Sequence, residues 1–283
     1  MSTTSQRKPR PWFITGASSG FGLAFARHAL GLGDFVVATA RRPERLAALA
    51  ADHPQQVLLQ ALDVTQLAQA ADAVQAAVAR FGGIDVLVNN AGYGIVGAVE
   101  ETPDDELRAQ MEANFFGAVN VIRAALPQLR AQRSGAIVNI SSMGGQLSFG
   151  GFGAYSASKF ALEGLSEALA QEMAPLGIKV LIVEPGAFRT SFAGDALRHM
   201  PVIEAYREIT GGIRDFAHGM DGTQAGDPAK VPRAVLAALD AGTTPLRLQL
   251  GADAVDAVRA HSQQMLQDLE AWKAVALDTC VDA

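Results

Sequence analysis

The chain has 283 residues, of which 49% are hydrophobic and 18% are charged, so it can bury a large core and is not intrinsically disordered. Its formal net charge of −6 offers no basic surface to nucleic acid, and its single cysteine, Cys280, excludes an intrachain disulfide. The five histidines lack metal-ligand spacing, so no metal site is expected.

Short apolar runs and helical patterns alternate along most of the chain. Strands are predicted, in order, at residues 12–14, 35–40, 57–62, 84–88, 136–140 and 179–184. Helices are predicted after the turn that ends at Gly22, from Pro43, from Thr65 to Arg80, from Thr102 to Arg133, and from Ala154 to Ala174. Six alternations of this kind predict a parallel sheet that is covered by helices on both faces.

Two of these helices begin with capping signals. Thr65 is expected to be the N-cap of the helix that ends at Arg80. Thr102-Pro103-Asp104-Asp105 combines a capping hydroxyl, a proline for the first helical position and two acids for the first turn.

The pattern changes after the sixth strand. Residues 188–226 contain three glycine clusters and no regular periodicity, which predicts an irregular lid over the substrate. A helix at 228–241, a strand at 246–250 and a helical tail at 252–283 follow. No linker interrupts the chain, so one domain over residues 1–283 is expected, with residues 1–11 flexible.

Targeting signals are not evident in the sequence. The N-terminal residues are polar and lack the apolar stretch of a signal peptide, and no apolar run is long enough to span a bilayer. The sequence therefore predicts a cytoplasmic protein that does not bind membranes.

A glycine-rich turn follows the first predicted strand. Gly16, Gly20 and Gly22 would let the backbone approach a pyrophosphate, and the next helix directs its N-terminal amides at the anion. The second strand is followed by Arg41 and Arg42 instead of an acid, which favours the 2′-phosphate of NADP(H) over NAD(H), the alternative. The arginines could also be simply solvated.

Tyr155 and Lys159 form the pair with the clearest catalytic chemistry. Four residues apart on a helix, they share one face, and the ammonium would lower the pKa of the phenol toward a useful value. Tyr155 is therefore a candidate general acid/base. Ser142 precedes a glycine-rich segment that could fold its hydroxyl over the phenol, and the neighbouring Ser141 is a competing candidate.

These motifs together resemble the short-chain dehydrogenase/reductase family, in its common Tyr-x-x-x-Lys subgroup. The matching positions, in family order, are Thr15-Gly-x-x-x-Gly-x-Gly22, Asp63, Asn89-Asn90-Ala91-Gly92, Asn114, Ser142, Tyr155, Lys159, Pro185-Gly186 and Thr190. The resemblance extends from Trp12 to about Leu250 and implies a Rossmann-type, doubly wound α/β fold. That fold has a mainly parallel seven-stranded sheet in a single domain.

The resemblance also implies a catalytic tetrad. Tyr155 would exchange a proton with the substrate oxygen, and Lys159 would hold the nicotinamide ribose. Ser142 would orient the substrate oxygen, and Asn114 would kink its helix and hold a water. A plainer alternative is that Asn114 only bonds its own helix backbone.

By the same resemblance, a larger set of residues would bind the cofactor. This set is Gly16, Ser18, Ser19, Gly20, Phe21, Gly22, Arg41, Arg42, Asp63, Val64, Asn90, Ala91, Gly92, Tyr155, Lys159, Pro185, Gly186, Phe188 and Thr190. Asp63 would contact the adenine, although it could instead only support the turn near Thr65.

The substrate should meet the loops after Ser142 and Pro185. These loops carry Leu147, Phe149, Phe152, Phe188, Phe192, Met200, Ile203, Tyr206, Phe216 and Met220, which predicts a hydrophobic carbonyl or alcohol unless the side chains only pack the lid. Two segments, 158–164 and 184–190, look most like the hydroxysteroid and retinol dehydrogenase branch.

The family usually forms dimers or tetramers through two long helices, so a homodimer or homotetramer is expected through the apolar faces of residues 115–129 and 160–169. Two other functions are consistent with such a fold. One is a non-catalytic NADP(H) sensor, and the other is an epimerase or dehydratase of the extended branch. The intact tetrad argues against the sensor, and the glycine spacing argues against the extended branch.

Overall fold

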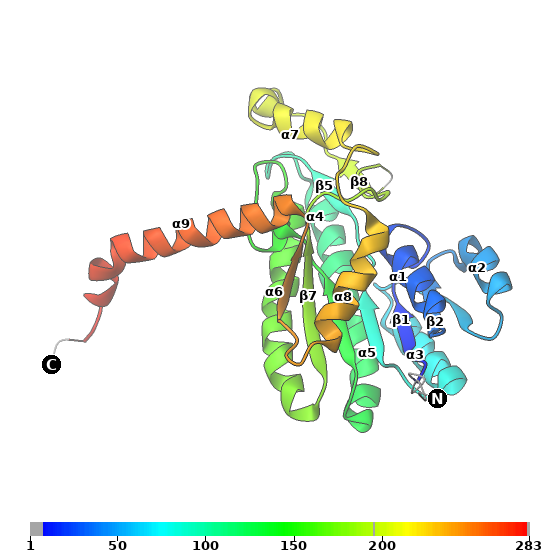
Figure 1. Ribbon diagram of the computed structural model, residues 1–283. Helices are drawn as coiled ribbons and strands as arrows, with labels where there is room; N and C mark the ends of the chain where they lie inside the picture. Colours follow the sequence, from blue (N-terminus) through cyan, green and yellow to red (C-terminus); the bar gives the residue numbers. More distant parts are fainter. Residues whose placement is uncertain (1–7, 195, 282–283) are drawn as a thin grey trace.

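A seven-stranded parallel sheet forms the centre of the protein (Figure 1). The structure is a computed structural model and describes residues 8–194 and 196–281. The strands are β1 (Pro11–Ile14), β2 (Phe35–Ala40), β3 (Val57–Ala61), β4 (Val86–Asn89), β6 (Ala136–Ile140), β7 (Lys179–Pro185) and β9 (Arg247–Leu250). Every pair of neighbours is parallel, in the order β3-β2-β1-β4-β6-β7-β9. The predicted Rossmann-type sheet is thus confirmed.

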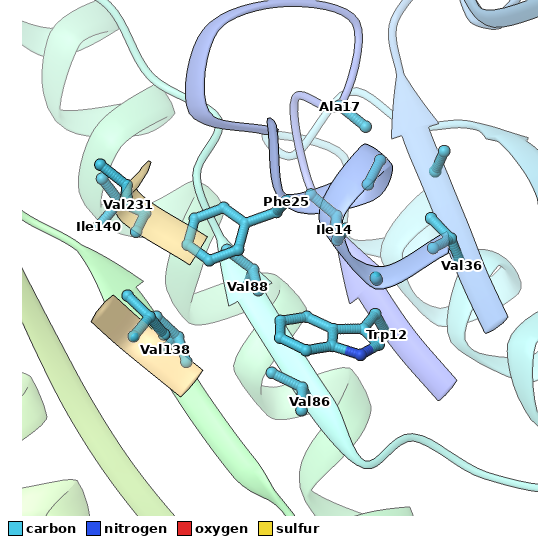
Figure 2. Packing of buried hydrophobic residues seen from close by; sticks show 14 of the residues in the cluster. Trp12, Ile14, Ala17, Phe25, Val36, Val86, Val88, Val138, Ile140 and Val231 are labelled. Carbon is cyan, nitrogen blue, oxygen red and sulfur yellow. The ribbon is translucent and has the colours of Figure 1, made fainter. Parts of the chain in front are cut away.

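Helices cover both faces of this sheet. The helices α1 (Gly20–Gly31) and α8 (Val231–Asp240) pack on one face, while α3 (Leu67–Phe81), α5 (Gly117–Gln132) and α6 (Gly153–Met173) pack on the other. Side chains along a strand alternate between the faces. Trp12 and Ile14 accordingly join the first core, and Phe13 joins the second. In the first core the Phe25 ring lies beside Trp12, 6.2 Å between ring centres (Figure 2).

The strand order reverses at β1, which has β2 on one side and β4 on the other. The connections on either side of β1 and β4 run in opposite directions along the sheet. The region beyond the carboxyl ends of these two strands, called the crevice below, is where open α/β sheets bind ligands.

Both predicted helix caps differ from the structure. The α3 helix begins two residues after Thr65, whose hydroxyl donates to Asp63 Oδ1 at 2.8 Å instead of capping. Pro103 is the N-cap of α4 (Asp104–Met111), and the Thr102 hydroxyl donates backward to Ala98 O at 3.0 Å. In both places a nearby acceptor outside the helix competes successfully for the hydroxyl.

Residues 188–226 are more regular than the sequence predicted. They contain β8 (Leu197–His199), which pairs with β5 (Gly94–Val96), and the helix α7 (Arg207–Gly219). The α7 helix is attached through a buried ion pair between Arg214 and Glu101 of 2.6 Å. Both contacts join segments about a hundred residues apart, so no local sequence pattern reports them.

The remaining elements lie at the edges. Pro43 opens a short 3₁₀ turn (Pro43–Leu46) before α2 (Ala47–Asp52), as its position predicted. The last helix, α9 (Ala252–Leu277), extends away from the sheet, and its Trp272 side chain is 68% exposed (Figure 1). Within the described residues, none of the helices combines the length and apolarity that a bilayer span requires.

The N-terminal segment predicted to be flexible is described only from Lys8 onward, and residues 1–7 lie outside the described residues. Arg10 forms an ion pair with Asp240 of 2.8 Å, and its backbone N–H donates to Asp34. These contacts fasten the start of β1 to the adjoining helix and strand.

Candidate active site

The glycine-rich turn after β1 has a shape that only glycines allow. Gly16 and Gly20 have positive φ angles of 64° and 51°. A Cβ atom at position 22 would collide with Gly16 O and would lie 2.7 Å from Asn90 Nδ2 and 2.9 Å from Ala17 Cα. The backbone is therefore folded tightly against itself, which fits the close approach that a pyrophosphate requires.

Asn90 fixes this turn from the neighbouring strand. Its side-chain amide donates to Thr15 O and Gly16 O, at 2.9 and 3.2 Å, and the Thr15 hydroxyl accepts from the backbone N–H groups of Asn90 and Ala91. The predicted cofactor residue Asn90 thus supports the turn with its side chain. The Asn89-to-Gly92 segment and the glycine turn form one unit at the crevice.

The amino end of α1 faces the loop that follows β7. Ser19 is the N-cap residue but its side chain makes no capping hydrogen bond, and the first turn contains no acid. Thr190 lies against Gly20, and the Ser191 hydroxyl donates to Ser19 Oγ at 3.4 Å. The positive end of the helix dipole and the nearby hydroxyls fit an anionic group such as a pyrophosphate.

Residues that would contact the adenosine half lie along the adjacent strand ends. Arg41 and Arg42 directly follow β2 and are exposed, and neither forms an ion pair within residues 8–194 and 196–281. Asp63 Oδ1 accepts from the backbone N–H and the hydroxyl of Thr65, which supports the plainer interpretation of its role as well. Val64 packs against Gly117 at the start of α5.

Tyr155 and Ser142 meet at Gly144. Ser142 Oγ accepts from Gly144 N at 3.0 Å, and a Cβ atom on Gly144 would touch both Ser142 Oγ and the Tyr155 ring, at 3.3 and 3.4 Å. Gly144, two residues after Ser142, thus lets the two hydroxyl-bearing side chains approach each other. Ser141, the competing candidate, is buried and faces Gly145 instead.

Lys159 lies one helical turn beyond Tyr155 and is 6% exposed. Its Nζ donates to Ile140 O at 2.8 Å and lies 5.8 Å from the centre of the Tyr155 ring. The carbonyl at the end of β6 therefore holds the ammonium beside the phenol, as the shared helix face predicted.

The pKa of Tyr155 differs from the lowered value that a neighbouring Lys159 was expected to cause. Burial raises the pKa of Tyr155 to about 12, against the opposing hydrogen bond with Ser142. Burial also lowers the pKa of Lys159 to about 8, with Glu163 opposing. In the protein alone, desolvation sets the direction of the pKa shift for both groups, because burial disfavours the charged form of each.

Asn114 sits in a π-helical segment, Glu112–Phe116, between α4 and α5. Its Nδ2 donates to Tyr93 O and to Ser158 Oγ, at 2.9 and 3.1 Å, and its Oδ1 accepts from Tyr93 N. The alternative that Asn114 bonds its own helix is therefore wrong. The widened turn aims the amide at the segment after Gly92 and at α6, where the Ser158 hydroxyl donates to Tyr155 O.

The segment after β7 reaches toward the same crevice. Phe188 contacts the Phe21 ring, with 5.3 Å between ring centres, and lines a cavity of 300 Å³ near Gly226 and Leu250. Gly186 is packed against Asp253 from the first turn of α9, whose carboxylate accepts from Ala187 N at 2.7 Å. The structure thus brings Phe188 and Thr190 to the glycine turn, whereas Pro185 pairs with β9 and Gly186 packs against the start of α9.

Two contributors were not identified from the sequence. Ser158 links Asn114 to the helix of Tyr155, and Asp253 anchors the loop after β7. Phe192, one of the side chains expected near the substrate, has its ring centre 5.4 Å from that of Tyr155. Ser158 adjoins Lys159, so its place in the motif could have indicated a role. Asp253 has no local signal, because it acts on residues far away in the chain.

Comparison with known proteins identifies the family. A family model described as short chain dehydrogenase matches residues 12–200, about two thirds of the chain. The chain belongs to this family. As a short-chain dehydrogenase it is an oxidoreductase, and it is 42% identical to the oxidoreductase BOA17 of Botryotinia fuckeliana over 94% of this chain and 97% of that one.

Two solved structures support the same assignment. A short-chain dehydrogenase from Streptomyces avermitilis is 49% identical, with a TM-score of 0.91 over 99% of this chain and 100% of that chain. An alcohol dehydrogenase from Thermococcus sibiricus, complexed with 5-hydroxy-NADP, is 25% identical, with a TM-score of 0.72 over 86% of this chain and 96% of that chain.

Proposed function

We propose that this short-chain dehydrogenase is an NADP(H)-dependent oxidoreductase that interconverts a carbonyl and an alcohol on a hydrophobic small molecule. The observation that carries the proposal is the meeting of Ser142 and Tyr155 at Gly144, with the Lys159 ammonium 5.8 Å from the ring. The alcohol dehydrogenase of similar fold, solved with 5-hydroxy-NADP, supports both the cofactor class and the alcohol chemistry.

The chain would supply positioning and a proton. The chemistry of a bound nicotinamide is hydride transfer to the carbonyl carbon. Tyr155 would donate its phenolic proton to the carbonyl oxygen, and Ser142 would donate a hydrogen bond that orients the same oxygen. Lys159 would stabilise the phenolate that is left, and a solvent proton would then restore the phenol. In alcohol oxidation each step is reversed.

The cofactor preference is testable at Arg41. Arg41→Ser is expected to weaken NADPH binding by about tenfold and to leave NADH binding within about twofold, because one charge-assisted contact to the 2′-phosphate is worth roughly 1.5–3 kcal/mol. Arg130→Ser is the matched control. It removes the same charge, and Arg130 is exposed at the far end of α5. Dissociation constants can be measured by fluorescence titration. Equal affinity of the unaltered protein for NADPH and NADH would contradict the preference.

The substrate is proposed to be apolar because aromatic rings flank the acid/base. The ring centres of Phe152 and Phe192 lie 6.3 and 5.4 Å from that of Tyr155. Phe192 belongs to the segment 188–226, which would cover the substrate as a lid.

The decisive assay follows NADPH absorbance against a panel of ketones, aldehydes and quinones. Turnover of hydrophobic members is expected. Turnover of small charged members alone would exclude the apolar site, and no NADPH oxidation with any member would favour a non-catalytic NADP(H) sensor.

A homodimer or homotetramer is proposed through α4, α5 and α6. Phe116 and Phe160 are 45% and 46% exposed, and Phe116 also lines a surface hollow of 330 Å³ with Leu107 and Met111. Phe116→Asp is expected to convert the oligomer to a monomer, because a carboxylate would have to be buried in an apolar interface. Light scattering after size exclusion measures this, with the exposed Leu67→Asp on α3 as the control. A monomeric unaltered protein would contradict the proposal.

A further inference from the structure

A cluster of polar side chains lies buried behind Lys159. It contains two carboxylates, Glu163 from α6 and Glu184 from the end of β7, which are 4% and 0% exposed. Arg247 and Gln249 from β9 and Gln146 from the loop after Ser142 complete the cluster, and Gln249 Nε2 donates to Glu184 Oε2 at 2.6 Å. Four separate elements thus converge on two acids that the proposed catalytic step does not use.

Arg247 and Gln146 both bridge the two carboxylates. Arg247 Nε lies 3.0 Å from Glu163 Oε2 and 3.2 Å from Glu184 Oε1. Gln146 Nε2 donates to the same two oxygens, at 3.3 and 3.1 Å. The acids are therefore held close together, and one guanidinium is shared between them.

The remaining oxygen of Glu163 lies beside Ser141. Glu163 Oε1 and Ser141 Oγ are both buried and both face Gly145, and the Ser141 hydroxyl interacts with the Glu163 carboxylate as a hydrogen-bond donor. Two like charges this close, away from water, cannot both ionise at little cost. Burial accordingly raises the pKa of Glu163 to about 7, against the opposing Ser141 and Arg247, and it raises the pKa of Glu184 too.

Glu163 is also the carboxylate whose charge acts on Lys159. The two residues are four apart on α6 and share one face of the helix. The charge of Glu163 opposes the effect of burial on the ammonium. The charge of the carboxylate pair therefore acts directly on the group that the proposed mechanism needs in its protonated form.

We propose that Glu163 and Glu184 share one proton, and that its release supplies the negative charge that keeps Lys159 protonated. Glu163 is thus a positioning residue that acts through Lys159. The kinetic consequence of this inference rests on the proposed function. The proton sharing itself does not depend on that function. The charged groups that face the pair are Lys159 and Glu167 on α6 and Arg247 on β9.

The charge balance gives the sign of the pH effect. With one proton shared, the pair carries one negative charge beside Arg247, which also forms an ion pair with Glu167. After its release the pair carries a second negative charge, which acts on Lys159. The pKa of Lys159, about 8, therefore depends on the ionised pair. Without Glu163 the ammonium would lose its proton at a lower pH.

The kinetic test is Glu163→Gln, assayed from pH 6 to pH 9. The alkaline limb of the kcat profile is expected to move down by about one pH unit, which lowers kcat about tenfold at pH 9 and less than about twofold at pH 6. Glu163→Asp, which keeps the charge, should restore most of the profile. Glu172→Gln is the matched control, because it removes the same charge from an exposed position further along the same helix, and its profile should not move.

A second measurement separates this inference from the proposed function. In the full-length protein without substrate, ¹⁵N NMR of labelled lysine should show Lys159 titrating at a lower pH in Glu163→Gln than in the unaltered protein. ¹³C NMR of labelled glutamate should show one protonated carboxyl in the pair below neutral pH. An unmoved Lys159 titration, or a pair fully ionised at pH 6, would overturn the proposal whether or not the protein turns over any substrate. A loss of kcat equal at every pH would show a structural role instead.

Discussion

Tyr155→Phe is expected to lower kcat by about 10³-fold while leaving NADPH affinity within about threefold of the unaltered protein. The ring would keep its contacts with Phe152, Phe192 and Gly144, so the substitution removes only the hydroxyl. Proton transfer by a positioned side chain contributes about 10² to 10⁴ in rate, and no neighbouring group can replace a donor that meets Ser142 at this point. Stopped-flow single turnovers measure the chemical step directly.

The control for this variant is Tyr206→Phe. The Tyr206 hydroxyl donates to Glu100 at 2.7 Å on the surface, so its loss should leave kcat unchanged. Retained turnover in Tyr155→Phe would exclude Tyr155 as the acid/base. Loss of NADPH binding together with turnover would show that the variant disturbs the crevice instead of the proton transfer.

Gly22→Ala is expected to weaken NADPH binding at least 100-fold and to lower the free energy of unfolding by about 2 kcal/mol, the range for overpacking at a tight site. The added methyl group would collide with Gly16 O and press on Ala17 Cα, and these backbone atoms cannot move without opening the turn. Isothermal titration with NADPH and chemical denaturation measure the two effects separately.

Gly31→Ala provides the matched control on the same helix. A Cβ atom at position 31 meets nothing within 4 Å, so this change should preserve NADPH binding and leave stability the same or slightly higher. If Gly22→Ala bound NADPH normally, the glycine turn could not be the pyrophosphate site.

The pH behaviour of the site follows from burial more than from neighbouring charge. The sequence predicted that Lys159 would lower the pKa of Tyr155, but the buried phenol has a raised pKa and the buried ammonium a lowered one. Spacing on a helix reports which side chains are neighbours. It does not report how much water surrounds them, and desolvation decides the sign here.

The local elements were largely predictable. The six strands and the helix that carries Tyr155 lie within a few residues of their predicted positions, because a buried parallel strand is a continuous apolar run and each run ends where polar or glycine residues begin. The caps at Thr65 and Thr102 were not predictable in the same way. Their hydroxyls donate to acceptors two and four residues earlier in the chain, Asp63 Oδ1 and Ala98 O, which compete with the first amides of the helix.

The order of residues along the chain determined the alternation of strands and helices, the glycine turn and the Tyr155–Lys159 pair, since each depends on neighbours within one or two turns. The tertiary structure alone decided how Asn114 reaches Ser158, how β8 joins β5, and how Arg247 brings Glu163 and Glu184 to one guanidinium. Asn114 and Ser158 are 44 positions apart, and the paired residues of β5 and β8 are 103 positions apart. Such pairs form only when the core has packed and water has been excluded.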